Sequence, residues 1–273
     1  MFQRVMVAVV GIPFLLLVLL WAPDWATMVL VAGMCAIGAH ELIHAVAGEK
    51  GKALAPLTVI AAALVPVCVY VEGAQLLPLT AAVAAVFVFA LFVFAILHYG
   101  KETAIPFADV TAAIFGGLGF PLMLSCLLRL RMVEYMGKAL VFLPLCISFG
   151  SDTFALFAGM LFGKHKLAPL VSPKKTVEGA VGGLVGGVFG TALLTVIVTY
   201  VIRDAFMAPV HILLFGIVGS VISQIGDLSF SVIKREFGVK DYGKLLPGHG
   251  GILDRFDSVT FVAPFVWLVL NFL

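Results

Sequence analysis

Charged side chains gather in one stretch of this chain, from Ser231 to Asp257. Five glycines and one proline in the same stretch disfavour a helix through its middle. Carboxylates can hold metal ions, and lysine and arginine can bind phosphate groups. The stretch therefore predicts a site for a metal and a nucleotide phosphate. Its acidic residues are Glu236, Asp241, Asp254 and Asp257, and its basic residues are Lys234, Arg235, Lys240, Lys244 and Arg255.

Three aspartates are the candidate metal ligands and catalytic residues. Asp254 and Asp257 are three residues apart, so on a helix they would share one face. Asp227 precedes them in an apolar segment, about two helical turns, roughly 9 Å, inside its end. Hard oxygen ligands of this kind suit Mg²⁺ or Mn²⁺, especially when a polyphosphate completes the coordination shell. The alternative for Asp254 and Asp257 is a solvated pair of acids favoured by the helix dipole.

The basic residues of the stretch are candidate phosphate ligands, and Lys234 and Arg255 are also candidate catalytic residues. Gly250 and Gly251 would let backbone N–H groups approach an anion closely. His249, which precedes them, could act as an acid or base or could cap the loop. The preference of lysine and arginine for the cytoplasmic side of a membrane would explain the number of basic residues. It would not explain the aspartates and glycines between them.

A second polar loop covers residues 163–179. Ser172, which a proline follows, predicts a helix cap with proline in the first turn. Lys174 and Lys175 come next, and a helix N-terminus with two lysines is a natural phosphate receiver. We therefore expect these residues to bind the substrate, and Glu178 to help bind a metal or to pair with a lysine.

The rest of the chain is strongly apolar. Of its 273 residues, 62% are hydrophobic and 12% are charged, whereas a typical soluble domain carries about 25% charged residues. This composition, with a mean hydropathy of +1.17, predicts an all-α, polytopic integral membrane protein. The net charge of +2 does not suggest nucleic-acid binding. The four dispersed cysteines lack metal-binding spacing and are interpreted as small buried hydrophobes.

A membrane-spanning helix needs roughly 20 apolar residues, and nine segments qualify. With nine spans, 13 of the 17 lysines and arginines share one side with the amino terminus and the 231–257 stretch, and the positive-inside rule makes that side cytoplasmic. We treat residues 1–273 as a single transmembrane domain. In it, residues 1–140 form a scaffold with possible lipid access, and residues 141–273 carry the active site. The segments are about 5–22, 26–47, 54–71, 76–98, 107–128, 139–163, 177–201, 210–233 and 256–272.

Polar residues within these segments form three small groups. Helix packing through hydrogen bonds is one role open to them, but a buried aspartate also needs a cation or a proton. The third group, His40, Glu41 and His44, resembles a set of metal ligands at helical spacing. The alternative is a polar group at the membrane boundary, and the sequence assigns it no role. The groups are Ser220, Ser223, Gln224, Asp227, Ser231 and Lys234; then Ser148, Ser151 and Asp152; then His40, Glu41 and His44.

Glycines recur at four-residue spacing along the segment 177–201. Small residues at this spacing let helix backbones approach closely. We therefore predict a close-packing face for neighbouring helices or a partner subunit. The two rows are Gly179, Gly183 and Gly187, and Gly182, Gly186 and Gly190.

The polar motifs resemble the signature of the bacterial phosphatidate cytidylyltransferases, also called CDP-diacylglycerol synthases. The resemblance covers about residues 150–257 and is long and ordered. Before residue 150 it is only a general likeness of hydrophobic spans. The matching residues are Asp152-Thr-x-Ala155, Ser172-Pro-Lys-Lys-Thr-x-Glu-Gly179, Gly226-Asp227, Ser231-x-Ile-Lys-Arg235, Lys240-Asp241 and Leu246-Pro-Gly-His-Gly-Gly-Ile-x-Asp-Arg-Phe-Asp257.

This resemblance implies the reaction of CTP with phosphatidic acid to give CDP-diacylglycerol and pyrophosphate, with a divalent cation. It also implies a multi-span helical protein of the bacterial inner membrane, often a homodimer among membrane lipids, with its active site on the cytoplasmic side. The implied metal ligands are Asp227, Asp254 and Asp257. The implied phosphate ligands are Lys174, Lys175, Lys234, Arg235, Lys240, Lys244 and Arg255, supported by Asp152, Asp241 and Glu178.

Two other functions remain open from the residues alone. A CTP-dependent lipid or prenol kinase would use similar groups but would release CDP in place of pyrophosphate. An ion-coupled transporter could place Asp152 and Asp227 in a membrane cavity. It would not need the glycine-rich loop at residues 248–251, and it would form no CTP-dependent product.

Overall fold

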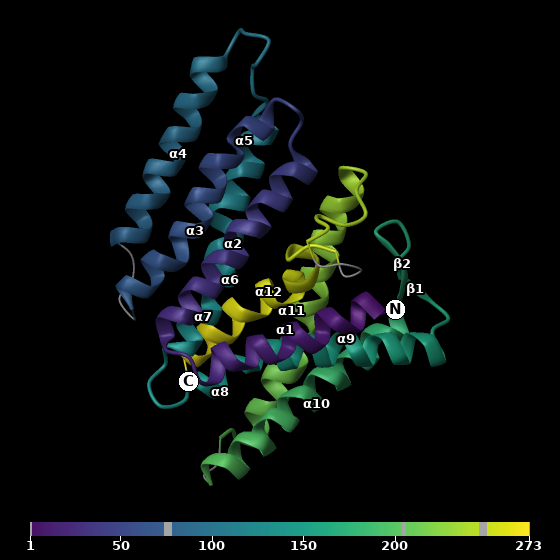
Figure 1. Cartoon of the computed structure of the whole chain (residues 1–273). Coiled ribbons are helices and arrows are strands. Elements are labelled where there is room, and N and C mark those ends of the chain that lie inside the picture. Colours follow the sequence, from purple (N-terminus) through teal and green to yellow (C-terminus); the bar gives the residue numbers. More distant parts are fainter. Residues whose placement is uncertain (1, 74–77, 204–205, 246–249, 273) are drawn as a thin grey trace. The chain divides into compact units, whose positions relative to one another are not determined.

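The computed structural model describes residues 2–73, 78–203, 206–245 and 250–272, with only the backbone at residues 2–8 and 202. This part of the chain is almost entirely helical and contains one short β-hairpin (Figure 1). The helices and strands are α1 Phe2–Leu20, α2 Asp24–Val46, the 3₁₀-helix η1 Gly51–Leu54, α3 Ala55–Glu72, α4 Pro78–His98, α5 Phe107–Ile114, the π-helix η2 Phe115–Gly119, α6 Phe120–Leu124, α7 Cys126–Arg131, α8 Gly137–Leu140, α9 Phe142–Phe162, β1 Lys166–Ala168, β2 Ser172–Thr176, α10 Val177–Ile202, α11 Pro209–Glu236 and α12 Leu253–Leu270.

Seven helices within the described ranges are long and apolar enough to cross a membrane. They confirm the predicted all-α, polytopic membrane class. The first and last predicted spans correspond to α1, whose side chains are described from Val9 onward and form an apolar stretch to Leu20, and to α12, which carries three charged residues within its first two turns. The seven are Asp24–Val46, Gly51–Glu72, Pro78–His98, Phe107–Arg131, Gly137–Phe162, Val177–Val201 and Pro209–Glu236.

The chain divides into two compact units. The first unit comprises Met1–Met132 and Glu236–Phe256, and the second comprises Val133–Arg235 and Asp257–Leu273. The loop that precedes α12 therefore packs with the amino-terminal helices, although it is far from them in the sequence. The charged stretch contributes residues to both units.

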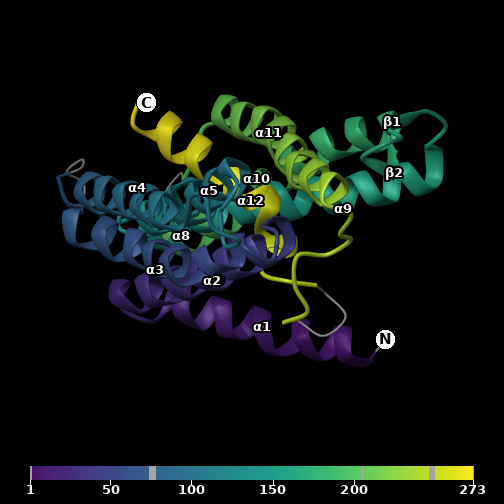
Figure 2. The ribbon, with the colours of Figure 1, turned by 90° about the horizontal axis from the view of Figure 1, so that it is seen from above.

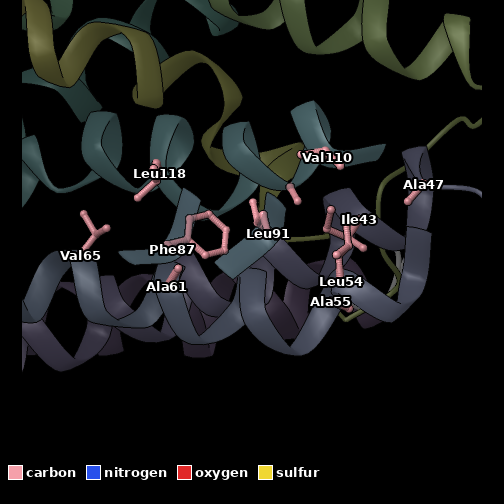
Figure 3. Close-up of a cluster of buried hydrophobic side chains, with 11 residues drawn as sticks. Ile43, Ala47, Leu54, Ala55, Ala61, Val65, Phe87, Leu91, Val110 and Leu118 are labelled. Carbon is pink, nitrogen blue, oxygen red and sulfur yellow. The ribbon is translucent and has the colours of Figure 1, made fainter. Parts of the chain in front are cut away.

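The core of the first unit lies among α2, α3, α4 and α5 (Figure 3). Phe87 and Leu91 of α4 are buried there, together with Val65 of α3. Gly117 of the π-helix η2 has no side chain, and a Cβ at this position would lie 2.6 Å from the Phe87 ring. The glycine therefore makes room for the largest side chain of this cluster.

The predicted glycine face packs helix against helix within the second unit, where α9 and α10 run side by side (Figure 2). A Cβ on Gly186 would collide with the backbone carbonyl of Gly150 in α9. On the other side of α10, the Ser220 hydroxyl of α11 donates to the Gly183 carbonyl at 3.1 Å. The prediction of close packing is confirmed, and the partners are helices of the same chain. The row that faces α9 is Gly182, Gly186 and Gly190, and Gly183 and Gly187 face α11.

The loop between α9 and α10 contains the β-hairpin, which joins the ends of these two helices (Figure 1). Strands β1 and β2 pair in antiparallel fashion, with Lys166 opposite Thr176 and Ala168 opposite Ser172. Pro173 fits this strand because a proline is tolerated in an edge strand, where its missing N–H is not needed.

The predicted helix cap at Ser172 is wrong. Helix α10 begins one residue after Thr176, and the Thr176 hydroxyl accepts the N–H of Gly179 at 3.1 Å. That is the hydrogen bond of an N-cap residue. Lys174 and Lys175 therefore lie on strand β2 and not at a helix N-terminus. The reason is that strand pairing extends the chain through Ser172, so the helix can begin only after it.

Replacing Gly186 by alanine should destabilise the second unit. The added methyl group would collide with the Gly150 carbonyl, and overpacking of this kind costs about 1–3 kcal/mol. Thermal unfolding in detergent micelles, followed by circular dichroism, should show a lower Tm than the wild-type protein. Gly33→Ala on α2 is the matched control, because nothing lies within 4 Å of a Cβ there. Equal Tm values for the two variants would contradict the close packing.

Candidate active site

Asp227 and Asp257 bring two carboxylates together in the second unit. Asp227 lies on α11, and Asp257 lies on the second turn of α12. The two helices approach closely because Gly226 has no side chain: a Cβ there would lie 3.1 Å from the Asp257 carbonyl oxygen. Asp257 is only 8% exposed, and the charge of Asp227 acts on its carboxyl group. Two of the three predicted metal ligands are therefore neighbours.

Lys175 neutralises one of these two carboxylates. Its ammonium group forms an ion pair with Asp227, and the two side chains are 26% and 25% exposed. Ser231, one turn further along α11, donates its hydroxyl to the same carboxylate at 3.4 Å. A partly buried carboxylate without such partners would be costly. The hairpin thus supplies a cation to an aspartate that lies within a membrane-spanning helix.

Two more of the predicted site residues act on the same pair. Lys234, half-buried on α11, and Asp152, exposed on α9, both act electrostatically on Asp257. Lys174 is exposed on strand β2, next to the lysine that binds Asp227. The second unit therefore gathers acidic and basic groups from α9, α11, α12 and the hairpin.

Two further predicted site residues hold the hairpin in place. The Glu178 carboxylate accepts the N–H groups of Lys164 at 3.1 Å and His165 at 3.2 Å, and it lies 2.6 Å from the His165 ring nitrogen Nδ1. Arg235 donates from Nε to the Val171 carbonyl at 3.0 Å. Glu178 thus fixes the base of the hairpin, and Arg235 fixes its turn. Within the described ranges Glu178 pairs with the His165 ring and with no lysine side chain, and its predicted role in binding a metal stays a prediction.

Asp254 organises the loop before α12 in the first unit. Its Oδ2 atom accepts the N–H of Tyr242 at 2.8 Å and the N–H of Gly251 at 3.0 Å. Gly250 has a φ of +86°, a conformation that residues with a side chain rarely adopt. The Gly251 N–H, predicted to face a phosphate, is therefore bonded to Asp254 in this structure. The predicted metal role of Asp254 stays a prediction.

The other predicted residues of the first unit are polar side chains at its surface. Each is exposed, so a phosphate group in solution could reach it. His249 lies outside the described residues. The exposed residues are Lys240, Asp241, Lys244 and Arg255.

The sequence analysis missed the role of Glu41. This side chain is 6% exposed, and its two carboxylate oxygens accept the N–H groups of Ile252 at 3.2 Å and Leu253 at 3.1 Å. His40 and His44 are instead exposed and stack on one another, with ring centroids 3.9 Å apart. The three residues therefore do not converge on a metal. The one signal in the sequence was an acid placed within an apolar segment.

The described residues contain no group of three or more histidine, cysteine or acidic side chains that could hold a metal ion. Asp227 and Asp257 nevertheless suit Mg²⁺, which typically binds one or two protein carboxylates and takes its other ligands from water and substrate phosphates. The predicted set of three aspartates stays a prediction, because Asp254 belongs to the other unit.

Known proteins resemble stretches of 120 to 166 residues of this chain. A stretch of 159 residues is 36% identical to a phosphatidate cytidylyltransferase of Bacillus subtilis (strain 168) and covers 58% of this chain and 56% of that protein. A protein of the same name from Rickettsia prowazekii (strain Madrid E) is 32% identical over 166 residues, which are 60% of this chain and 72% of that protein. A third, from Staphylococcus saprophyticus, is 49% identical over 120 residues, which are 44% of each chain.

The match to a family model is broader than these pairwise alignments. The model describes the cytidylyltransferase family, and it matches residues 2–273, which include both units and all the predicted site residues. Because the match includes both the amino-terminal helices and the charged stretch, both are part of the pattern of this family. The chain belongs to the cytidylyltransferase family.

Proposed function

We propose that this chain is a phosphatidate cytidylyltransferase, which converts CTP and phosphatidate to CDP-diacylglycerol and pyrophosphate. Its family and the names of its relatives support an enzyme that transfers a cytidylyl group to a lipid phosphate. The observation that carries the proposal is the pair Asp227 and Asp257, with Lys175 bound to Asp227, in a unit made of membrane-spanning helices. Such a unit suits one substrate held in lipid and another that arrives from water.

The proposed reaction asks little of a general base. A phosphatidate oxygen, already anionic, attacks the α-phosphorus of CTP and forms a new P–O bond. The bond between the α-phosphorus and the bridging oxygen breaks, and its electron pair leaves with pyrophosphate. Alignment of the two phosphates and neutralisation of their charge are therefore the main tasks of the protein.

Asp227 and Asp257 would hold a divalent cation, Mg²⁺ or Mn²⁺, with Asp254 as a further predicted ligand. A divalent cation, when bound, neutralises the triphosphate and the pyrophosphate that leaves. Lys175 forms an ion pair with Asp227 in this structure, so the lysine occupies the position that a cation would take beside this carboxylate. The same lysine, when released from Asp227, would be free to bind a phosphate oxygen.

The remaining predicted site residues would bind or position the substrates. Lysine and arginine give charge-assisted hydrogen bonds to phosphate oxygens. The supporting residues would orient these groups or offer backbone N–H donors. We assign phosphate binding to Lys174, Lys175, Lys234, Arg235, Lys240, Lys244 and Arg255, and support to Asp152, Ser172, Glu178, Asp241, His249, Gly250 and Gly251.

The chain is a membrane protein, and we propose that it lies in the bacterial inner membrane with its active site on the cytoplasmic side. The seven candidate spans and the bacterial relatives support the membrane location. The uneven distribution of lysine and arginine supports the orientation. A homodimer is likewise proposed, from the family resemblance alone.

The purified protein, given CTP, phosphatidate and Mg²⁺ in detergent or liposomes, should form CDP-diacylglycerol and an equal amount of pyrophosphate. Chelation of divalent cations should stop the reaction, because the triphosphate charge would no longer be neutralised. Thin-layer chromatography of labelled lipid and an enzymatic pyrophosphate assay measure the two products. Release of CDP in place of pyrophosphate would indicate a lipid kinase, and no CTP-dependent product would favour a transporter.

Asp257→Asn should lower turnover by about a hundredfold or more, because an amide cannot supply the negative charge that a divalent cation requires. The protein should still insert into the membrane, since asparagine has almost the same shape. Glu134→Gln, at an exposed position in the turn between α7 and α8, is the matched control. Near-normal turnover in the Asp257 variant would remove this residue from the site.

Lys175→Met should lower kcat/KM by about tenfold or more, because it removes a charge-assisted bond from a partly buried carboxylate. Lys175→Arg keeps the positive charge and should retain more activity than the methionine variant. Steady-state rates at saturating Mg²⁺ measure both. If the two variants were equally active, the charge of Lys175 would have no part in the reaction.

A further inference from the structure

Glu41 joins two parts of the first unit that are more than 200 residues apart in the sequence. It lies near the end of α2, and its carboxylate accepts the N–H groups of Ile252 and Leu253, where α12 begins. The N–H groups of a first helical turn have no partner within their own helix. Glu41 therefore takes the place of a capping residue, but from a distant helix.

Two glycines of the same loop pack directly against this carboxylate. A Cβ added at Gly243 or at Gly251 would collide with the side-chain carboxylate of Glu41. The backbone of the loop thus contacts Glu41 at three places: near residue 243, at residue 251 and at the start of α12. Any larger residue at either glycine would push the loop away from Glu41.

A second carboxylate completes the support of this loop. Asp254 accepts the N–H groups of both Tyr242 and Gly251, so it links the backbone at these two residues. Asp254 is local to the loop, whereas Glu41 fixes the loop to the helices of the first unit. Removal of Glu41 would therefore leave residues 242 and 251 linked through Asp254 but no longer attached to α2.

Backbone N–H groups are the hydrogen-bond partners of the Glu41 carboxylate. Among the described residues, no lysine, arginine or histidine forms an ion pair with it. A carboxylate at a helix N-terminus gains from the helix dipole and from charge-assisted hydrogen bonds. A neutral side chain of the same size would lose both, and a glutamine amide would also turn an N–H donor towards other donors.

We propose that Glu41 is a positioning residue for CTP: it holds residues 242–245 and 250–254 so that the basic side chains in and beside these two stretches meet the triphosphate. This inference rests on the proposed function. Lys240, Lys244 and Arg255 lie in or next to the loop and are exposed, so their reach depends on where the loop is held. The triphosphate carries more negative charge than the lipid phosphate, so a displaced loop weakens CTP binding most.

The attachment of the loop can be measured without any assay of activity. Glu41→Gln should raise the rate of amide hydrogen exchange in peptides that cover residues 250–254 by about tenfold or more, because each lost charged hydrogen bond is replaced by a weaker one. Peptides from α3 and α4 should exchange as in the wild-type protein. Glu49→Gln is the matched control, since Glu49 is highly exposed just after α2 and pairs only with Lys52.

Kinetic constants then separate positioning from general damage. Glu41→Gln should raise KM for CTP by about tenfold, while KM for phosphatidate stays within about twofold of the wild-type value. Gly243→Ala keeps Glu41 but pushes the loop away from it, so it should show the same pattern. If Glu41→Gln does not fold, Gly243→Ala tests the proposal in its place.

Each outcome decides the proposal. Faster exchange in the loop with a selective rise in KM for CTP supports it. Unchanged exchange overturns it, as does faster exchange with unchanged kinetic constants or with an equal loss for both substrates. If the wild-type protein does not use CTP, the proposed function and the positioning role both fail, while the exchange rates still show whether Glu41 attaches the loop.

Discussion

A carboxylate within an apolar helical protein needs a partner for its charge, and this constraint shapes both units of the chain. In the second unit the partner of Asp227 is Lys175, which reaches the aspartate from a β-hairpin. In the first unit the partners of Glu41 are the N–H groups at the start of α12. Each pairing fixes a polar loop against membrane-spanning helices, because the loop must stay in place to keep the charge satisfied.

Small residues make these pairings possible by letting backbones approach. Gly226 admits α12 beside α11, so that Asp257 lies near Asp227. Gly243 and Gly251 leave room for the Glu41 carboxylate against the loop. The glycine rows of α10 pack this helix on α9 and α11, and α9 and α10 are the two helices that carry the hairpin. The close packing of the helices therefore also determines where the polar groups lie.

The β-hairpin changes how the lysines of the second loop can work. At a helix N-terminus, Lys174 and Lys175 would act together with the backbone N–H groups of the first turn. On strand β2 they act through their side chains alone, and one of them is already bound to Asp227. Glu178 and Arg235 secure the hairpin at its base and turn. These two charged side chains therefore hold the hairpin in place, in addition to any contact with a substrate.

Much of this molecule could be predicted from the sequence because the relevant signals are local. Long apolar segments predict membrane helices, four-residue glycine spacing predicts close packing, and the charged motifs predict the family. The nine predicted spans include α1 and α12 in addition to the seven described helices that are long and apolar enough to cross a membrane. Ser172 and its proline fit a strand as well as a helix cap, and only the pairing with β1 decides between them.

The residues of the site were named by the sequence, whereas their partners were decided by the tertiary structure. Asp227, Asp257 and the lysines stand out because charge is rare in an apolar chain. Glu41 is bonded to the start of α12, and Lys175 is bonded to Asp227. Neither pairing could be predicted from the spacing of these residues in the sequence. Such bonds form only when helices and loops pack together. Packing buries the charged groups, and each buried group then needs a hydrogen-bond donor that is still unpaired.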